Sequence, residues 1–175
     1  NYLKSLDPNR MILLQADIDE FNRNRNNLDN DLSAGKLATA QMVYQRYYER
    51  YSARLDWVVQ QVEPLVKNET FTGDDEIEID RKDSPWPADM QAADQLWVRY
   101  LKNDILALRL ADKPTDNIGA TLTRRFQTQK DRLDKQSPMD NFEIFMNAYT
   151  ELYDPHTNFM SPKSAENFDI SMALS

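Results

Sequence analysis

The strongest constraint on the fold is a long helical periodicity between Ala40 and Val66. Apolar and aromatic side chains recur there at alternating steps of four and three, at Tyr44, Tyr48, Tyr51, Leu55, Val58, Val62 and Leu65. Such steps place residues on one face of an α-helix, so the run predicts a long amphipathic helix with one buried stripe. The stripe covers only about three heptads, which is the lower limit for a coiled coil, so packing inside a helical domain is favoured.

A second helix is expected before this one, from Ala16 to about Leu32, with Gly35 as its carboxy-terminal stop. Two long antiparallel helices are the natural interpretation of these neighbouring segments. Residues 67–87 then break the pattern, and the prolines of Ser84-Pro85-Trp86-Pro87 block a helix until after Pro87. Ile77 and Ile79 alternate with acidic residues in this loop, which leaves room for one very short strand, and Phe71 and Trp86 are expected to pin the loop down.

Three further helices are expected after the loop. One runs from near Ala88 to before Pro114, the next is capped by Thr115 or Asp116, and the last begins at Ser137-Pro138, where Asp140 completes a capping box. Their expected apolar faces are Leu96, Trp97, Tyr100, Leu101, Ile105 and Leu108; Ile118, Leu122, Phe126 and Leu133; and Phe142, Phe145, Met146, Tyr149 and Leu152. The chain is therefore predicted to be mostly α, a multi-helix orthogonal or antiparallel bundle with long irregular loops.

Composition excludes several kinds of site. Glycine-rich phosphate loops and nucleophile elbows cannot be built from the three glycines, Gly35, Gly73 and Gly119. The absence of cysteine excludes disulfides and thiol chemistry within these residues, and a single histidine, His156, excludes a Ser-His-Asp triad. The net charge of -8 disfavours nucleic-acid binding. No apolar run of about 18 residues is present, so no membrane span is expected.

Two polar clusters have simpler interpretations than a site. His156 could be a lone general base, but a polar turn residue is favoured, and Asp154 beside it is expected to accept backbone N–H bonds. The alternation Asn27, Asp29, Asp31, Ser33 resembles the start of a calcium loop. Leu32 and Ala38 stand where such a loop needs Gly and Glu, so a solvated helix face is expected instead.

Charge and aromatic patterns leave alternatives open. The densest acidic cluster is Asp74, Asp75, Glu76, Glu78, Asp80 and Asp83. A solvated loop is favoured there, and weak cation binding or attraction of a basic partner is the alternative. Between Arg99 and Lys135 basic residues predominate, so a mildly basic face is expected to contact the acidic loop or another domain. Helically spaced aromatic residues are expected in the core, with a peptide-binding groove as the alternative, at Tyr44, Tyr47, Tyr48, Tyr51, Trp97 and Tyr100.

The most distinctive motif lies near the end of the sequence. It reads Tyr153-Asp154-Pro155-His156-Thr157-Asn158-Phe159-Met160-Ser161-Pro162, followed by Phe168 and residues 170–175. This resembles the joint of tail-specific, carboxy-terminal processing proteases, where a helical leader precedes PDZ and Ser-Lys protease domains. Other segments resemble the amino-terminal domain of the Gram-negative type of that family: Leu6-Asp7-Pro8-Asn9-Arg10, Gln15-Ala16-Asp17-Ile18-Asp19-Glu20-Phe21, Phe71-Thr72-Gly73-Asp74-Asp75, Pro85-Trp86-Pro87 and Leu122-Thr123-Arg124-Arg125.

The resemblance implies a helical amino-terminal domain over residues 1–160 and a joint over residues 161–175 that leads to PDZ and protease domains outside this sequence. Residues 170–175 are expected to lead into the first strand of the next domain. The implied parent is a periplasmic serine endopeptidase whose PDZ domain binds an apolar carboxy terminus and whose lysine acts as general base for a serine. Those groups are expected beyond Ser175, so Ser171, Ser175 and Lys163 are not assigned to them. No catalytic, cofactor-binding or metal-ligating residue and no cofactor is assigned within the chain.

The expected role of such a domain is to shape the active-site entrance and to hold substrate or partner proteins. The expected partners are the PDZ and protease domains of the parent chain, protein or peptide substrates, and an adaptor protein as a further candidate. Nucleic acid is not expected. Two alternatives remain: a stand-alone helical protein-interaction module whose aromatic stripe binds a partner helix, and a metal-binding sensor that uses the acidic loop.

Overall fold

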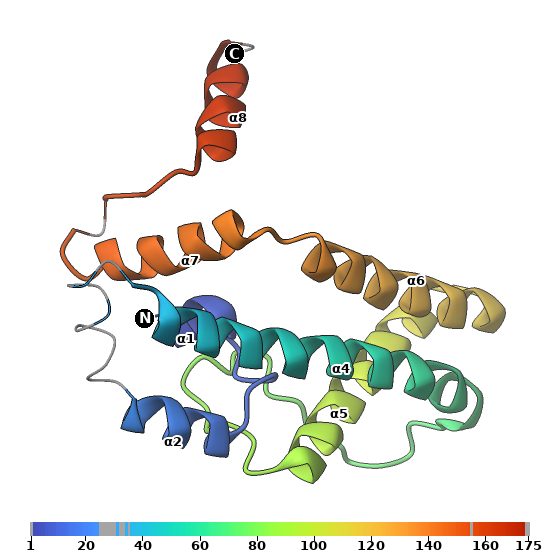
Figure 1. The fold of residues 1–175 in the computed structure, drawn as a ribbon. Coiled ribbons are helices and arrows are strands. Elements are labelled where there is room, and N and C mark those ends of the chain that lie inside the picture. The colour runs from blue at the N-terminus through green and yellow to red at the C-terminus, as the bar shows by residue number, and fades with distance from the viewer. Residues whose placement is uncertain (1, 25–30, 32–33, 35, 155, 174–175) are drawn as a thin grey trace.

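The computed structural model describes residues 2–24, 31, 34, 36–154 and 156–173, and within these ranges it contains helices and no strand (Figure 1). This confirms the mostly α prediction. No helix in the described part of the chain combines the length and apolarity that crossing a bilayer requires. The helices are α1 (Tyr2–Leu6), α2 (Gln15–Arg23), α4 (Ala38–Asn68), α5 (Met90–Leu110), α6 (Thr115–Asp134), α7 (Pro138–Thr150) and α8 (Pro162–Ala173).

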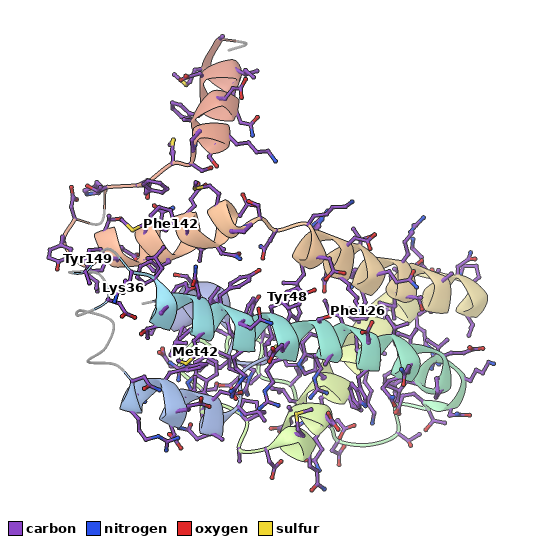
Figure 2. All side chains as sticks on the ribbon, viewed as in Figure 1. Lys36, Met42, Tyr48, Phe126, Phe142 and Tyr149 are labelled. Atoms are coloured by element: carbon purple, nitrogen blue, oxygen red, sulfur yellow. The ribbon has the colours of Figure 1, made fainter. Side chains whose placement is uncertain are left out.

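The centre of the fold is the antiparallel pair α4 and α6 (Figures 1 and 2). The periodic stripe of α4 forms this contact. The first three tyrosines of the stripe pack their rings against the core. Their hydroxyls donate to side chains of α6 and of the residues just after it: Tyr44 to Gln136 (2.6 Å), Tyr48 to Asp134 (3.0 Å) and Tyr51 to Gln129 (3.4 Å). The stripe then continues as the fully buried residues Leu55, Val58 and Val62. They pack in one core with Leu101, Ile105, Ile118, Leu122 and Phe126.

The expected pairing of α4 with a long preceding helix forms only in part, because α2 contacts α4 through Asp17 but is a short helix. The helix α2 ends at Arg23, and the long partner of α4 is α6. The physical reason is the length of the apolar faces, since α2 buries only Ile18 and Phe21 as apolar residues whereas α6 offers a stripe that runs from Ile118 to Leu133. Residues 25–30, 32–33 and 35 lie outside the described residues. The expected stop at Gly35 and the calcium-like alternation from Asn27 fall largely there.

Helix starts agree with the sequence in two places and differ in one. Asp89 caps α5 by accepting from the Ala92 N–H (2.8 Å), so the helix begins two residues after Ala88. The capping box before α7 forms as expected, with Ser137 and Asp140 bonded to each other's backbone N–H groups (3.2 and 2.8 Å). At α6 the structure puts Pro114 at the cap position and Thr115 inside the helix, because the fixed φ of proline already suits a helix entry.

The central loop is held by helices on either side. Arg109 of α5 donates to the Val66 and Glu69 carbonyls (2.8 and 2.9 Å), where the loop leaves α4. Trp97 of α5 holds the earlier segment between α1 and α2 by donating to the Met11 carbonyl (2.8 Å). The possible strand at Ile77 and Ile79 does not form. The Glu78 carbonyl between them accepts from the Tyr100 hydroxyl instead of a neighbouring strand.

Two expectations for the carboxy-terminal region are wrong. Leu152 was expected on the apolar face of α7, but α7 ends at Thr150 and Leu152 is 62% exposed. Residues 170–173 were expected to lead into a strand, but they are the last residues of α8. Ser161 and Pro162 start this helix in the cap and first positions, and no proline or glycine follows to end it before Ala173. Residues 174–175 lie outside the described residues.

Candidate functional site

His156 and Asp154 form a turn. The His156 backbone N–H donates to Asp154 (2.9 Å), and the Thr157 hydroxyl donates to the other oxygen of the same carboxylate (2.8 Å). These two bonds lower the pKa of Asp154. The interpretation of Asp154 as an acceptor of backbone N–H bonds is confirmed, and it holds His156 at an exposed position of the joint.

The segment after this turn runs back along α7 and is fastened to it. The Phe159 N–H donates to Asn147 (2.6 Å), the Ser161 N–H donates to Glu143 (3.3 Å), and the Phe159 ring meets Phe142 edge-on at 5.2 Å. Ser164 also donates its hydroxyl to Glu143 (2.8 Å). Glu143 therefore fixes the first turn of α8, and its hydrogen bonds to Ser161 lower its pKa.

Some acidic side chains in and beside the acidic loop form ion pairs with basic side chains of the same chain. Lys102 of α5 lies 2.7 Å from Asp75 and 3.0 Å from Glu69, so the expected contact between the basic face and the acidic loop forms at this residue. Arg81 pairs with Glu78 (3.0 Å) inside the loop. Among the residues that the structure describes, no group of three or more histidine or acidic side chains is placed to hold a metal ion. The ion pairs of Lys102 and Arg81 fit the favoured interpretation as a solvated loop, and the metal-sensor alternative stays a prediction.

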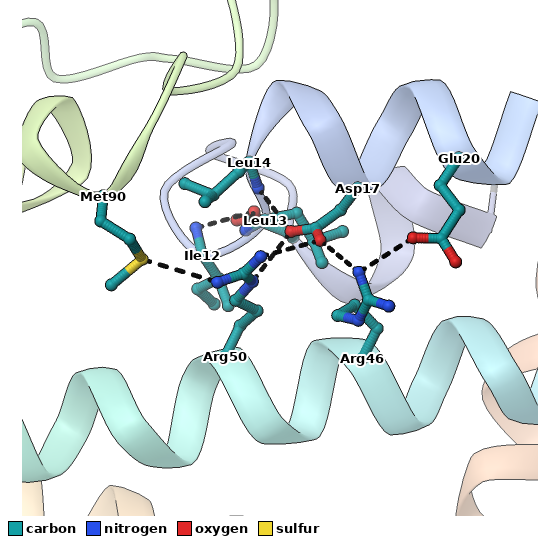
Figure 3. A network of polar contacts seen from close by, with 9 residues as sticks. Ile12, Leu13, Leu14, Asp17, Glu20, Arg46, Arg50 and Met90 are labelled. Atoms are coloured by element: carbon teal, nitrogen blue, oxygen red, sulfur yellow. Dashed lines mark hydrogen bonds and ion pairs between the residues drawn. The ribbon is translucent and has the colours of Figure 1, made fainter.

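A buried ionic network joins α2 to α4 (Figure 3). The Asp17 side chain is 1% exposed and accepts from Arg46 (2.6 Å), from Arg50 (3.0 Å to each oxygen) and from the Leu14 N–H (3.0 Å). Burial would raise the pKa of Asp17, but the bonds from Arg50, the Leu14 N–H and Arg46 outweigh it and hold the pKa below its usual range. From the sequence, Arg46 and Arg50 lie on the polar face of the predicted helix, but nothing there indicated Asp17 as their partner.

An apolar groove separates α4 from α7. The helix α7 packs on α1, while α4 packs on α6 and α5. Between α4 and the second half of α7 lies a hollow of about 400 Å³, and a second hollow of about 310 Å³ lies against the first half of α7. Tyr2, Ala40 and Phe145 line both. The Tyr2 ring meets Phe145 edge-on at 5.1 Å, so α1 forms a partition between the two hollows.

The groove uses few of the aromatic residues that the sequence singled out. Trp97 and the tyrosines Tyr47, Tyr48 and Tyr51 pack in or against the core, as favoured, and of the six predicted aromatics Tyr44 alone lines either hollow of this groove. The other aromatic lining is Tyr2, Phe21, Trp86, Phe142, Phe145 and Tyr149. Sequence reasoning missed it because these residues come from segments far apart in the chain. The apolar stripe of α7 was the one signal that could have indicated it.

Comparison with known proteins places this fold in a family. The family described as the tail specific protease N-terminal domain matches residues 1–163. The chain belongs to this family. A tail-specific protease of Haemophilus influenzae is 37% identical over 179 aligned positions, which cover 99% of the chain but 25% of that relative. The chain thus spans about a quarter of the length of a curated tail-specific protease. The match to the family ends at Lys163, the second residue of α8.

Proposed function

We propose that this chain is the non-catalytic amino-terminal domain of a periplasmic serine endopeptidase that processes proteins from their carboxy terminus. The observation that carries the proposal is the match of almost the whole chain to one quarter of a tail-specific protease. The serine nucleophile, its lysine base and a PDZ domain are expected in the remaining length of the parent. The serines of the joint support this division, because Ser161 is 1% exposed and Ser171 donates its hydroxyl to the Phe168 carbonyl (2.7 Å) within α8.

The proposed role of the domain is to shape the approach to the active site and to hold substrate or partner proteins. Two features support this role. The groove between α4 and α7 offers an apolar surface of the size that a few side chains fill. The helix α8 leaves the body with Phe168, Ile170 and Met172 about half exposed, a surface suited to contact with the PDZ or protease domains of the same parent (Figure 1).

The test compares the full-length parent with a form that lacks residues 1–160. Hydrolysis of a short peptide with an apolar carboxy terminus should change by less than about two-fold, while processing of a whole protein substrate should fall at least about ten-fold. Equal loss of both activities would instead indicate a purely structural role. Peptide hydrolysis by the 175-residue chain itself, persisting through repurification, would contradict the non-catalytic assignment.

A stand-alone interaction module is the second candidate, and the groove is the observation that favours it. This second candidate predicts that the chain binds a partner protein without any effect on proteolysis by the parent. Normal processing by the parent without residues 1–160, together with retained partner binding by the chain, would support this alternative.

A further inference from the structure

We infer that the groove between α4 and α7 binds an internal polypeptide segment that combines apolar side chains with an aspartate or glutamate, whose carboxylate lies against Lys4 and Arg10. The inference rests on the proposed holding function and names the chemistry of the segment held. An unfolded stretch of a substrate protein is the occupant that this chemistry describes.

The walls of the groove supply the apolar part of the recognition. Leu3, Val43 and Ala148 line the first hollow. Leu152 lies at its edge with 62% of its surface exposed, and Tyr149 beside it is half-buried. Because apolar surface gains about 25 cal/mol per Å² when it leaves water, side chains that fill this hollow are attracted to it.

The charge around the first hollow supplies the acidic part. None of the described residues that line either hollow is acidic, although the chain carries a net charge of -8. The two charged side chains in the lining are Lys4, which is exposed, and Arg10. An acidic group on a bound segment therefore meets two cations and no nearby lining carboxylate, while a basic group would be repelled.

Arg10 is held in place but incompletely paired. Its φ of 52° lies in the left-handed region, and its backbone N–H donates to the Asp7 carbonyl (3.1 Å). The guanidinium donates to the Ser84 carbonyl (2.6 Å) and lies 5.6 Å from the Trp86 ring centre. Its contact to Asp83 is long, at 3.9 Å, and its buried Nε has no hydrogen-bond partner among the residues that the structure describes. The Arg10 side chain is 18% exposed, and a ligand carboxylate at that exposed part of the guanidinium would form a closer ion pair than Asp83 provides.

The shape favours an internal segment over a chain end. The two hollows lie on either side of Tyr2, whose ring meets Phe145 and whose hydroxyl donates to the Ala40 carbonyl (3.5 Å), so a bound chain that reaches Lys4 and Arg10 in the first hollow must cross over Tyr2 to reach Phe142 in the second. A single terminal residue would leave the second hollow unfilled. The helix α8 of a second copy has similar chemistry, with Phe168 and Met172 beside Asp169, so self-association is the competing occupancy to be measured.

The test measures fluorescence anisotropy of labelled ten-residue peptides, acetylated and amidated at their ends, bound to the 175-residue chain. Three peptides share apolar residues and carry Glu, Gln or Lys at one central position, and a fourth carries Gln and a free carboxy terminus. The Glu peptide should bind about five-fold more tightly than the Gln peptide, as expected for one partly exposed ion pair, and the Lys peptide should bind most weakly.

Charge variants locate the binding. Lys4→Glu should abolish the preference for Glu over Gln, and Leu152→Asp should weaken binding of the Glu peptide about five-fold. Both positions are exposed, so circular dichroism should match the unmodified chain. Lys113→Glu makes the same charge change at the exposed turn between α5 and α6 and should leave every affinity unchanged.

Several results would overturn the inference. These are equal affinity for the Glu and Gln peptides, binding that requires the free terminus, or equal loss of preference in Lys4→Glu and Lys113→Glu. A dimer seen by sedimentation that Met172→Asp dissociates would assign the groove to a second copy. Absence of peptide binding alongside impaired protein processing by the truncated parent would leave the holding function standing and remove only the inferred ligand. Peptide binding together with unimpaired protein processing by the truncated parent would support the inferred ligand and contradict the holding function.

Discussion

Asp17 is an acidic side chain in a position that water barely reaches, and its neighbours explain how the fold tolerates it. A buried carboxylate without partners loses its hydration, whereas two guanidinium groups and one backbone N–H replace that hydration here. Removing one member of such a network leaves the others buried and unpaired. The loss of stability therefore includes the unpaired guanidinium groups of Arg46 and Arg50 as well as the altered residue.

Asp17→Asn should lower the free energy of unfolding at pH 7 by about 3 kcal/mol, measured by urea denaturation. The folded-state pKa of Asp17 is lowered, so its contribution is present above the unfolded pKa of about 3.9 and is lost as the pH falls from there toward the folded value. The difference in stability between the two proteins should therefore shrink below about pH 4.

The control for this prediction is Asp19→Asn, because Asp19 is an exposed carboxylate on the same helix whose side chain accepts from the nearby Gln15 (2.9 Å). It should change stability by less than about 0.5 kcal/mol. A comparable loss in both variants would mean that the Arg46 and Arg50 network contributes little.

The pKa of Asp7 shifts in the opposite direction to the pKa of Asp17. The stability of the unmodified chain therefore combines two opposing pH dependences, and the contribution of Asp17 is measured from the difference between variants. Burial raises the pKa of Asp7, although the N–H groups of Leu13, Met11 and Ile12 bond to its carboxylate and lower it again. A raised carboxyl pKa contributes stability below the unfolded value and loses it as the pH rises through the folded value. The two buried aspartates thus oppose each other in the unmodified chain.

At the scale of elements, the orientation of α8 depends on a short anchored segment and not on a packed helix face. No residue within α8 is buried, and its first turn is held to α7 by Glu143 through Ser161 and Ser164. A helix without a buried face is marginal in isolation because tertiary packing provides most helical stability. The anchor at Glu143 is therefore the main feature that fixes the direction in which α8 leaves the rest of the structure.

Glu143→Ala should increase amide hydrogen exchange across residues 161–168 at least about ten-fold while leaving exchange in α4 and α6 unchanged, because an anchor worth about 1–3 kcal/mol is lost locally. Glu166→Ala, an exposed change within α8 itself, serves as the control and should leave exchange at Ser161 as it is. Unaltered protection of residues 161–168 in Glu143→Ala would show that α8 is held in another way.

At the scale of the whole molecule, one core spans α4, α5 and α6, and the amino-terminal segment joins it through Leu13, Ile18 and Phe21. A single continuous core predicts that these elements unfold together. The hollows between α4 and α7 place the groove at the edge of this core, where Phe21 and Val43 belong to both.

Leu122→Ala should lower the free energy of unfolding by about 3 kcal/mol, because Leu122 is fully buried between α6 and α4 and its loss leaves a cavity. Urea transitions followed by circular dichroism and by tryptophan fluorescence should coincide and shift together. Leu110→Ala removes the same atoms from a side chain that is 77% exposed and should be nearly neutral. Transitions that separate would indicate more than one cooperative unit.

Much of the local structure could be predicted from the sequence, because it depends on neighbours in the chain. The stripe of α4, the capping box at Ser137 and Asp140, and the turn at Asp154 all use contacts within a few residues. Predictions failed where distant segments compete for the same surface. The choice of α6 as the long partner of α4 is one case. Leu152 is a different case, because it is exposed where α7 has already ended at Thr150. A peptide-binding groove was only an alternative in the sequence, and its place could not be predicted, since it is the space that Tyr2, Val43 and Ala148 leave between three helices.

The amino-acid sequence by itself determined that the chain is helical, where most of its helices begin, and that it resembles one family, because periodicity, capping and motif spacing are properties of consecutive residues. Only the tertiary structure decided which helices pair, how Asp17 and Arg10 find their partners, and where α4 and α7 remain apart. Burial and pairing depend on which surfaces meet in space, and residues distant in the chain, such as Asp17 and Arg50, are joined only when the core forms.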